Sequence, residues 1–329
     1  MDTGTHIAMG FGLAGLAHLD PTVAAHPELA GAVLLGTLIG SHAPDFDTVL
    51  KLRGNATYIR NHRGRSHSIP AILIWAGLIS GGIYAFFPGI SYLHLLLWTL
   101  LAVVVHVSID LFNSYGTQAA RPFSKQWISL NVINIFDPFI MGIHLIGFLF
   151  WAAGFHPGYV FSAVYAVMIT YIIQRVMAYR KLVQAVKADL GEEGHYVLLP
   201  TIRWTRWGIV AETATASYVG ELRNKQIIWH DTFYKKDENQ VVENAKQDAN
   251  IQAFLSFTRY PHVYTKKREF GHEVRWIDLR YRTKTHYAFV GIVYLDEGLN
   301  IIDSYTGWEY REHKIESKVL VPELALEKS

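Results

Sequence analysis

The sequence predicts an α-helical membrane bundle of about six segments, followed by a cytoplasmic α+β domain made mainly of antiparallel strands. Three observations lead to this fold class. Half of the 329 residues are hydrophobic and only 18% are charged, which is unusual for a soluble protein of this length. Long uncharged stretches end near residue 175, and mixed charged and aromatic sequence begins near residue 195. The predicted domains are therefore residues 1–180 and residues 195–329.

Six apolar stretches are candidate membrane segments. The third and fourth are long, nearly free of charge and separated by the turn residues Pro88 and Gly89. The first two are shorter than the ~20 residues that a full helical span needs. They are rich in glycine, which lets helix backbones approach closely in lipid. The six stretches are residues 4–19, 29–41, 69–87, 92–112, 136–153 and 157–178.

Lys and Arg are confined to alternate loops of this bundle. They occur in residues 51–65, in residues 121–125 and after residue 175, whereas residues 20–28, 88–91 and 154–158 contain neither. Short loops rich in Lys and Arg stay in the cytoplasm. The pattern predicts a multi-pass membrane protein with both termini in the cytoplasm. The N-terminus starts with an acidic residue rather than a basic one, so we expect no cleavable signal there.

The second half of the chain favours a sheet. Residues 195–311 contain β-branched and aromatic stretches broken by turn signals such as Asp296-Glu297-Gly298, and residues 239–255 suit one helix. Its tryptophans either pack in the core or face lipid headgroups, and we favour the core. They are Trp204, Trp207, Trp229, Trp276 and Trp308.

Composition also excludes several classes of site. The chain has no cysteine, which rules out disulfides and thiolate metal sites. The net charge of +2 and the lack of a basic stripe interleaved with aromatic residues argue against a nucleic-acid partner. Membrane lipids are the expected partners instead.

Histidine and aspartate gather around two short motifs, HAPDFD at residues 42–47 and HRGRSH at residues 62–67. The predicted topology places both motifs, the start of the first segment and the end of the fourth at one cytoplasmic membrane surface. Ionisable groups at a membrane are costly unless they are paired, ligated or hydrated, so their convergence needs a common cause. The eight residues are His6, His42, Asp45, Asp47, His62, His67, His106 and Asp110.

A bound metal supplies that cause. Neutral imidazole and carboxylate are ligands for zinc, manganese and iron, of which we favour zinc. His106 and Asp110 are four residues apart and so share one helix face. The predicted ligands are His6, His42, Asp45, His62, His67, His106 and Asp110, and their number suggests two ions, or one ion with supporting groups.

Two further residues are assigned to chemistry. Asp47 lies two residues from Asp45 in a Pro-broken turn and is the predicted general base for a metal-bound water. Arg63 is predicted to clamp a phosphate, the alternative being that it only fixes the topology.

At these motifs the chain resembles the membrane-bound metal-dependent hydrolases, a family of YdjM-type inner-membrane proteins with a Bacillus branch called YfhP. The resemblance covers about residues 1–180 and rests on residues 42–47, on residues 62–68, and on His106 to Asp110 followed by residues 113–117. It implies hydrolysis with a divalent metal.

The predicted function is hydrolysis of a membrane-associated or lipidic ester, such as a phosphate ester, at the cytoplasmic face. Two alternatives stay open. A transporter would place ionisable residues near the midplane and on both sides. A membrane-anchored regulator would use a structural metal with a closed coordination sphere and the β-rich domain for partner binding.

Overall fold

The computed structural model describes residues 1–235, 239–311 and 314–319 and divides into two compact units. The first unit contains residues 1–47, 63–185 and 198–207. The second contains residues 48–62, 186–197 and 208 onward. Each unit therefore combines segments that are distant in the sequence.

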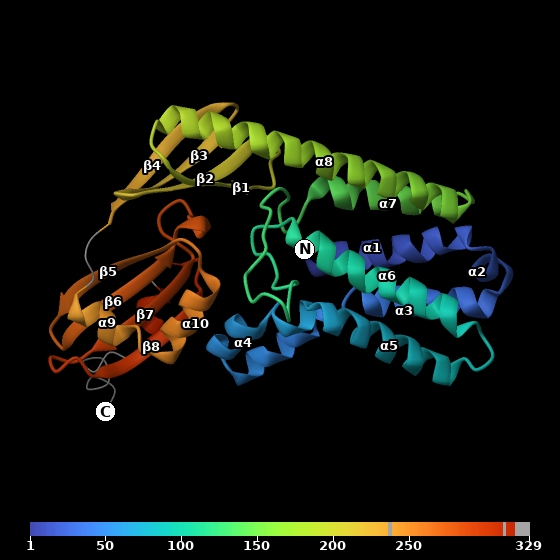
Figure 1. The fold of residues 1–329 in the computed structure, drawn as a ribbon, viewed down its shortest axis with the longest axis horizontal. Helices are drawn as coiled ribbons and strands as arrows, with labels where there is room; N and C mark the ends of the chain where they lie inside the picture. Colours follow the sequence, from blue (N-terminus) through green and yellow to red (C-terminus); the bar gives the residue numbers. More distant parts are fainter. Residues whose placement is uncertain (236–238, 312–313, 320–329) are drawn as a thin grey trace. The chain divides into compact units, whose positions relative to one another are not determined.

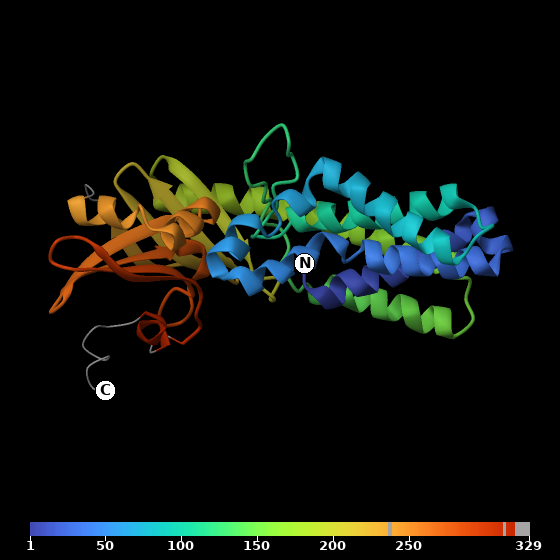
Figure 2. The ribbon, with the colours of Figure 1, turned by 90° about the horizontal axis from the view of Figure 1, so that it is seen from below.

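Helices that run alongside one another make up the first unit (Figures 1 and 2). α3 packs on α1, α5 and α6, and α1 also packs on α7. Met9, Leu13, Ile140 and Phe161 are central to its core. The helices are α1 (Thr3–Leu16), η1 (Ala17–Leu19), α2 (Pro21–Ala25), α3 (Pro27–Gly40), η2 (Ala43–Arg53), η3 (Arg65–His67), α5 (Ile69–Phe86), α6 (Tyr92–Leu111), α7 (Pro138–Ala152) and α8 (Pro157–Leu190), of which η2 and α8 continue into the second unit.

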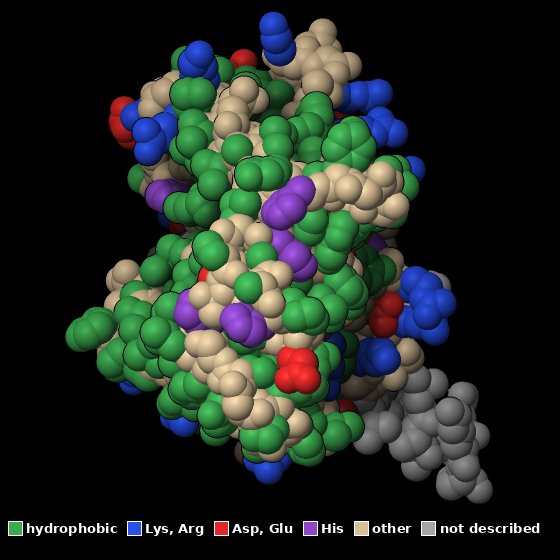
Figure 3. All heavy atoms as spheres, turned by 90° about the vertical axis from the view of Figure 1, so that its right-hand side faces the viewer, with side chains coloured by type: hydrophobic (Ala, Val, Ile, Leu, Met, Phe, Trp, Pro, Cys, Tyr) green, Lys and Arg blue, Asp and Glu red, His purple; other side chains and the backbone are tan. Residues whose placement is uncertain are grey.

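The six predicted membrane segments overlap α1, α3, α5, α6, α7 and α8, although α8 continues to Leu190, beyond the predicted end at residue 178. Within the described residues, α5, α6 and α8 are long and apolar enough to cross a membrane, whereas α3 and α7 are apolar but shorter. The helices thus form where the sequence predicts them, and six complete spans are not confirmed. Figure 3 looks onto the end of the unit that carries α2, where hydrophobic and His side chains fill most of the middle of the face.

Close helix packing depends on three glycines, as the composition suggested. A Cβ on Gly10 of α1 would lie 3.0 Å from the carbonyl oxygen of Thr37 in α3. A Cβ on Gly36 would lie 2.3 Å from the Thr99 hydroxyl of α6, and one on Gly40 would lie 3.1 Å from the Thr99 carbonyl oxygen. These contacts bring the end of α3 against α6. Gly31, by contrast, has open space beside it.

Two four-stranded sheets account for the β-rich half of the chain, with strand orders β1-β2-β3-β4 and β5-β6-β7-β8. The second sheet is antiparallel throughout. α10 packs on β7 and β8, where Phe254 stacks on Phe289. The elements are β1 (Gly194–Pro200), β2 (Arg206–Thr213), β3 (Ala216–Arg223), β4 (Gln226–Tyr234), α9 (Gln240–Ala245), α10 (Ala249–Phe257), β5 (Pro261–Arg268), β6 (Gly271–Asp278), η4 (Leu279–Tyr281), β7 (Phe289–Leu295), β8 (Ile301–Trp308) and η6 (Glu316–Lys318).

Residues 48–62, from between the two sequence motifs, group with this second unit. They include α4 (Asn55–Asn61), which packs on α10. Arg60 donates a hydrogen bond of 2.9 Å to the carbonyl oxygen of Ala249. The segment between the motifs thus contributes to the core of the C-terminal half.

Two sequence predictions for this half need correction. The single helix expected over residues 239–255 is two helices, because Asp248 caps a new helix by accepting from the backbone N–H groups of Asn250 and Ile251. Core packing is confirmed for Trp207 and Trp276, which are 1% and 2% exposed, but is wrong for Trp204, which is 51% exposed. Trp204 lies in a turn rather than on a strand face.

Candidate metal centre

Four segments of the first unit bring acidic and histidine side chains to one place. His6 belongs to α1, whose N-terminus is capped by Asp2, and His106 and Asp110 lie in the last turns of α6. Asp45 lies in η2, directly after Pro44, and His67 lies in η3. Apart from Asp45, these side chains are at most 1% exposed. The residues His6, Asp45, His67, His106 and Asp110 are called the metal cluster below.

The distances within the metal cluster match a shared ion. One ligand atom from each of His6, Asp45, His106 and Asp110 can be chosen so that all four lie within 4.8 Å of one another. The Nε2 atom of His67 lies 3.3 Å from Nε2 of His106 and 3.5 Å from a carboxylate oxygen of Asp45 and of Asp110. Ligands bound tetrahedrally at zinc distances are separated by roughly 3.3 Å. The side chains therefore lie close to coordinating positions.

The ring orientation of His106 is fixed by a hydrogen bond to the backbone. Its Nδ1 lies 2.6 Å from the carbonyl oxygen of Ser41, which can only accept, so Nδ1 carries the proton. The neutral ring then presents an Nε2 lone pair to the cluster. Such a contact on the outer nitrogen is typical of metal-binding histidines.

His67 is oriented in the same way through a serine. The Ser66 hydroxyl donates to Oδ2 of Asp47 at 2.5 Å, which leaves its oxygen to accept from Nδ1 of His67 at 3.0 Å. Asp47 also accepts from the backbone N–H of Arg63 at 3.0 Å. His67, like His106, therefore turns an Nε2 lone pair into the cluster.

The facing Nε2 atoms of His67 and His106 are the strongest sign of a bound cation. These two nitrogens lie 3.3 Å apart and 3.5 to 3.8 Å from carboxylate oxygens of Asp45 and Asp110, a spacing that suits a shared cation. Oδ1 of Asp45 is buried and has no hydrogen-bond partner among the described residues. Burial by itself would raise the pKa of Asp45, but its neighbours, the Arg63 cation among them, hold that pKa well below its ordinary value. An anionic Asp45 completes a donor set that fits a divalent ion.

Asp110 also has positive partners in the chain. The amino group of Met1 contacts one of its oxygens, and Nη2 of Arg63 lies 3.2 Å from the other. Asn113 donates to the same carboxylate at 3.1 Å. These contacts balance the charge of Asp110, whereas Oδ1 of Asp45 has no hydrogen-bond partner among the described residues. The fit to a metal therefore rests on His67, His106 and Asp45.

Arg63 is buried beside this cluster. It has a positive φ of 58°, and its guanidinium lies 3.4 Å from the side-chain oxygen of Asn113. Its Nε has no hydrogen-bond partner among the described residues. The arrangement places a cation next to the proposed ion, as a phosphate clamp requires.

Two predicted ligands lie outside the metal cluster. His42 packs edge-on against His6 with ring centroids 6.4 Å apart, and neither of its ring nitrogens has a hydrogen-bond partner among the described residues. Burial lowers its pKa, which keeps it neutral. His62 is the residue directly after α4 and belongs to the second unit. The ligand roles of both residues stay predictions.

The sequence reasoning missed the supporting groups Ser41, Ser66 and Asn113. Ser66 and Asn113 lie within the motif stretches quoted for the family resemblance, which was the available signal. Asn113 also accepts from the backbone N–H groups of Tyr115 and Gly116. Gly116 has a φ of 69°, and a Cβ there would lie 2.2 Å from the carbonyl oxygen of Ile128, so this loop requires glycine.

The comparison with known families agrees with these motifs. Residues 1–182, more than half of the chain, match the YdjM inner membrane protein family. The chain belongs to this family. The resemblance inferred from the motifs is thereby confirmed, and the YdjM region contains every residue of the metal cluster. Metal binding and hydrolysis stay predictions.

The remainder of the chain matches the YfhP middle domain over residues 195–233 and the YfhP C-terminal alpha/beta plait domain over residues 240–319. Over 322 residues the chain is 47% identical to the uncharacterized protein YfhP of Bacillus subtilis (strain 168), covering 97% of this chain and 98% of YfhP. No solved structure matches the chain. This YdjM-family chain is thus similar to YfhP over nearly the whole length of both proteins.

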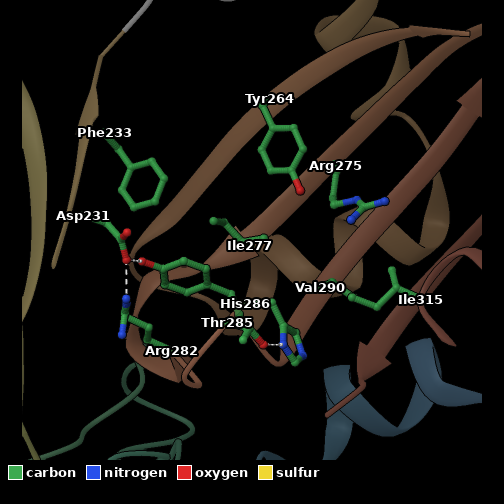
Figure 4. Close-up of a pocket in the computed structure, with 11 residues that line it drawn as sticks. Asp231, Phe233, Tyr264, Arg275, Ile277, Arg282, Thr285, His286, Val290 and Ile315 are labelled. Atoms are coloured by element: carbon green, nitrogen blue, oxygen red, sulfur yellow. Dashed lines mark hydrogen bonds and ion pairs between the residues drawn. The ribbon is translucent and has the colours of Figure 1, made fainter. Parts of the chain in front are cut away.

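A second polar site, apart from the metal cluster, is a cavity in the second unit (Figure 4). Its walls come from β4, β5, β6 and β7 and from the loop after η4. Asp231 accepts from Arg282 at 2.5 Å and from Tyr287 at 2.8 Å, and His286 contacts the carbonyl oxygen of Glu309. The two contacts of Asp231 join β4 to the loop between η4 and β7.

The metal cluster makes a direct test possible. We expect purified protein to retain about one or more equivalents of a transition metal. Asp45→Ala, His67→Ala and His106→Ala should each lower that content, because each removes one of the converging donors. Mass spectrometric metal analysis measures this. His94→Ala, which removes a histidine outside the cluster, is the control, and unchanged metal content in all three cluster variants would contradict the coordination.

The hydrogen bond from His67 to Ser66 gives a second test. Ser66→Ala should weaken metal affinity about 10- to 100-fold, because loss of an outer contact frees the ring of a ligand. Ser66→Thr keeps the hydroxyl and should bind like the parent protein. Competition with a chelator of known affinity measures both, and equal affinity in the alanine variant would show that Ser66 does not orient His67.

Proposed function

We propose that this protein is a metal-dependent hydrolase of the inner membrane that acts on a lipidic phosphate ester at the cytoplasmic face. The observation that supports it most is the pair of buried Nε2 atoms of His67 and His106, facing each other beside the carboxylates of Asp45 and Asp110. A divalent ion held there would lower the pKa of a bound water toward neutrality.

The number of donors bears on which ion fits. Five side chains converge in the metal cluster, whereas a zinc ion in a protein usually takes four ligands. Two zinc ions would share these donors, or one six-coordinate manganese or iron ion would take five and keep a position for water. Zinc remains our first choice, since buried imidazole and carboxylate suit it.

The choice of a phosphate ester as the proposed substrate rests on Arg63. Its guanidinium lies beside Asp110 and is buried, so it adds a fixed positive charge at the edge of the cluster. Arg binds phosphate oxygens through paired N–H donors, and an Nε without a partner among the described residues keeps one such donor available. A phosphate between Arg63 and the ion would have its charge neutralised from two sides.

The location suggests that the substrate is lipidic. The cluster lies at the ends of α1 and α6, and α6 is one of the helices long enough to cross the membrane. An ester held in the membrane would reach this depth without leaving the lipid. The Lys and Arg pattern assigns this surface to the cytoplasm, with both termini on the same side and six membrane segments.

Hydrolysis can be measured with phosphatidic acid in mixed micelles, in the presence of zinc, manganese or iron. We expect release of inorganic phosphate by the parent protein and its loss in His67→Ala, because His67 lies at the centre of the cluster. Arg63→Gln should reduce turnover about 100-fold or more if the arginine stabilises charge in the transition state. A metal-loaded parent protein that releases no phosphate would favour the alternative, a membrane-anchored regulator with a structural ion.

Asp47→Asn tests the role of Asp47 within this proposal. The asparagine oxygen still accepts from Ser66, so orientation of His67 should survive, whereas basicity is lost. If Asp47 is the general base, the variant keeps metal and melts near the parent temperature but loses about 100-fold in rate. Full activity would restrict Asp47 to orienting Ser66 and His67.

The topology can be tested independently, because the chain has no native cysteine. Single cysteines at residues 24, 89 and 156 should react with an impermeant thiol reagent added to intact cells, since the loops without Lys or Arg are expected outside. Cysteines at residues 55, 125 and 190 should react only after lysis. Protection of residue 89 in intact cells would contradict the orientation.

A further inference from the structure

An apolar groove lies at the N-terminal end of α7, within the first unit. One wall consists of Pro138, Phe139, Gly142, Ile143 and Ile146 of α7, and the other of residues 202, 204 and 205 in the turn between β1 and β2. The space measures about 580 Å³ and is mostly apolar. We call it the α7 groove. It contains no residue of the metal cluster.

The turn that forms the second wall is held firmly against the helices. The Thr201 hydroxyl donates to the carbonyl oxygens of Arg203 and Arg206 at 3.1 and 2.8 Å, which fixes the shape of the turn. Nη1 of Arg175 in α8 donates to the carbonyl oxygen of Trp204 at 3.3 Å. The Trp204 ring lies edge-on to Phe139, with centroids 5.4 Å apart. The groove is therefore a built feature of the helical unit.

Two large apolar side chains of this turn are exposed to solvent. Ile202 is 53% exposed and Trp204 is 51% exposed, although Trp207, three residues further on, is 1% exposed. Exposing both residues to water would be unfavourable. They flank the groove, so an apolar occupant would cover them together with the wall of α7.

The surroundings of the groove indicate what that occupant is. The exposed face of α7 continues from Ile146 to Leu149 and Phe150, which are 53%, 71% and 48% exposed. This apolar face belongs in lipid, so the groove is continuous with the bilayer. Tryptophan is favoured at the level of the headgroups, which is the level expected where a membrane helix begins.

Charge at the same turn favours an anionic lipid. Arg203, which is exposed, lies between Ile202 and Trp204 of the groove wall, and Arg206, which is half-buried, directly follows Thr205 of the same wall. Asp137, directly before Pro138 of the α7 wall, is buried at the cap of α7, where Tyr171 donates to it at 2.8 Å. An arginine near an anionic membrane surface contributes about 1 kcal/mol to binding.

We propose that the α7 groove binds an anionic phospholipid of the cytoplasmic leaflet. The upper part of an acyl chain lies between α7 and Trp204, and the phosphate lies against Arg203 and Arg206. The turn thereby attaches the start of the β-rich half of the chain to the membrane surface. This site is separate from the metal cluster and requires no hydrolysis.

The nine tryptophans permit a fluorescence test in lipid nanodiscs, with Trp204→Phe used to isolate the signal of Trp204. The discs contain a minor fraction of either phosphatidylglycerol or phosphatidylcholine, brominated near the top of the acyl chains. We expect stronger quenching of Trp204 by the anionic lipid, with an enrichment of about fivefold or more, as one or two arginines would supply.

Arg203→Gln with Arg206→Gln should remove the preference for the anionic lipid and leave the quenching by phosphatidylcholine unchanged. Arg223→Gln with Lys225→Gln, two exposed basic residues in the turn between β3 and β4, is the control with the same change of charge and should keep the preference. A melting curve for each variant establishes that it is folded.

Two results would overturn the proposal. Equal quenching of Trp204 by the two brominated lipids in the parent protein would show that the groove has no preference for an anionic headgroup. The absence of quenching by either lipid would show that protein covers the groove instead, for instance a second copy of the chain. Neither result would affect the hydrolase proposal, whose measurement is phosphate release.

Discussion

The arrangement around the metal cluster depends on one constraint, that several polar atoms buried beside one another must be satisfied together. The Nε2 atoms of His67 and His106 are 3.3 Å apart, and both outer nitrogens are already engaged, by Ser66 and by Ser41. In a buried site an unpaired polar atom costs about 1–3 kcal/mol, and several together cost more. A cation among these atoms would reduce that cost, which supports the proposal of a metal centre.

The close packing of α3 on α6 positions side chains and backbone groups of the metal cluster. Glycine at Gly36 and Gly40 lets α3 approach α6 closely, and the residue that follows Gly40 is Ser41, whose carbonyl oxygen orients His106. A larger residue at Gly40 would crowd the Thr99 carbonyl oxygen and require a small shift between α3 and α6. The same end of α3 leads into Pro44 and Asp45, so one helix boundary positions both the hydrogen-bond partner of His106 and a proposed ligand.

The metal cluster and the turn at Trp204, both in the first unit, suit a membrane surface in different ways. The metal cluster buries ionisable groups at the ends of helices and balances them against one another, with Arg63 and Asp110 as the clearest pair. The turn at Trp204 does the opposite and exposes apolar groups at the start of α7. Both arrangements suit a position beside lipid, where buried charge must be neutralised and apolar side chains can remain on the surface.

The sequence by itself determined where the helices lie, because long apolar stretches need lipid and have little freedom to be anything else, and it identified the motifs that carry Asp45, His67 and His106. It also determined that the second half is built on strands, since β-branched and aromatic residues alternate there. Only the tertiary structure decided that Ser41, Ser66 and Asn113 support the cluster, that residues 48–62 group with the C-terminal half, and that Trp204 faces outward while Trp207 is buried. The physical reason is that local patterns report each residue's own tendency to be buried or exposed, whereas a hydrogen bond between residues 65 positions apart, such as that from His106 to Ser41, depends on how closely two helices can pack.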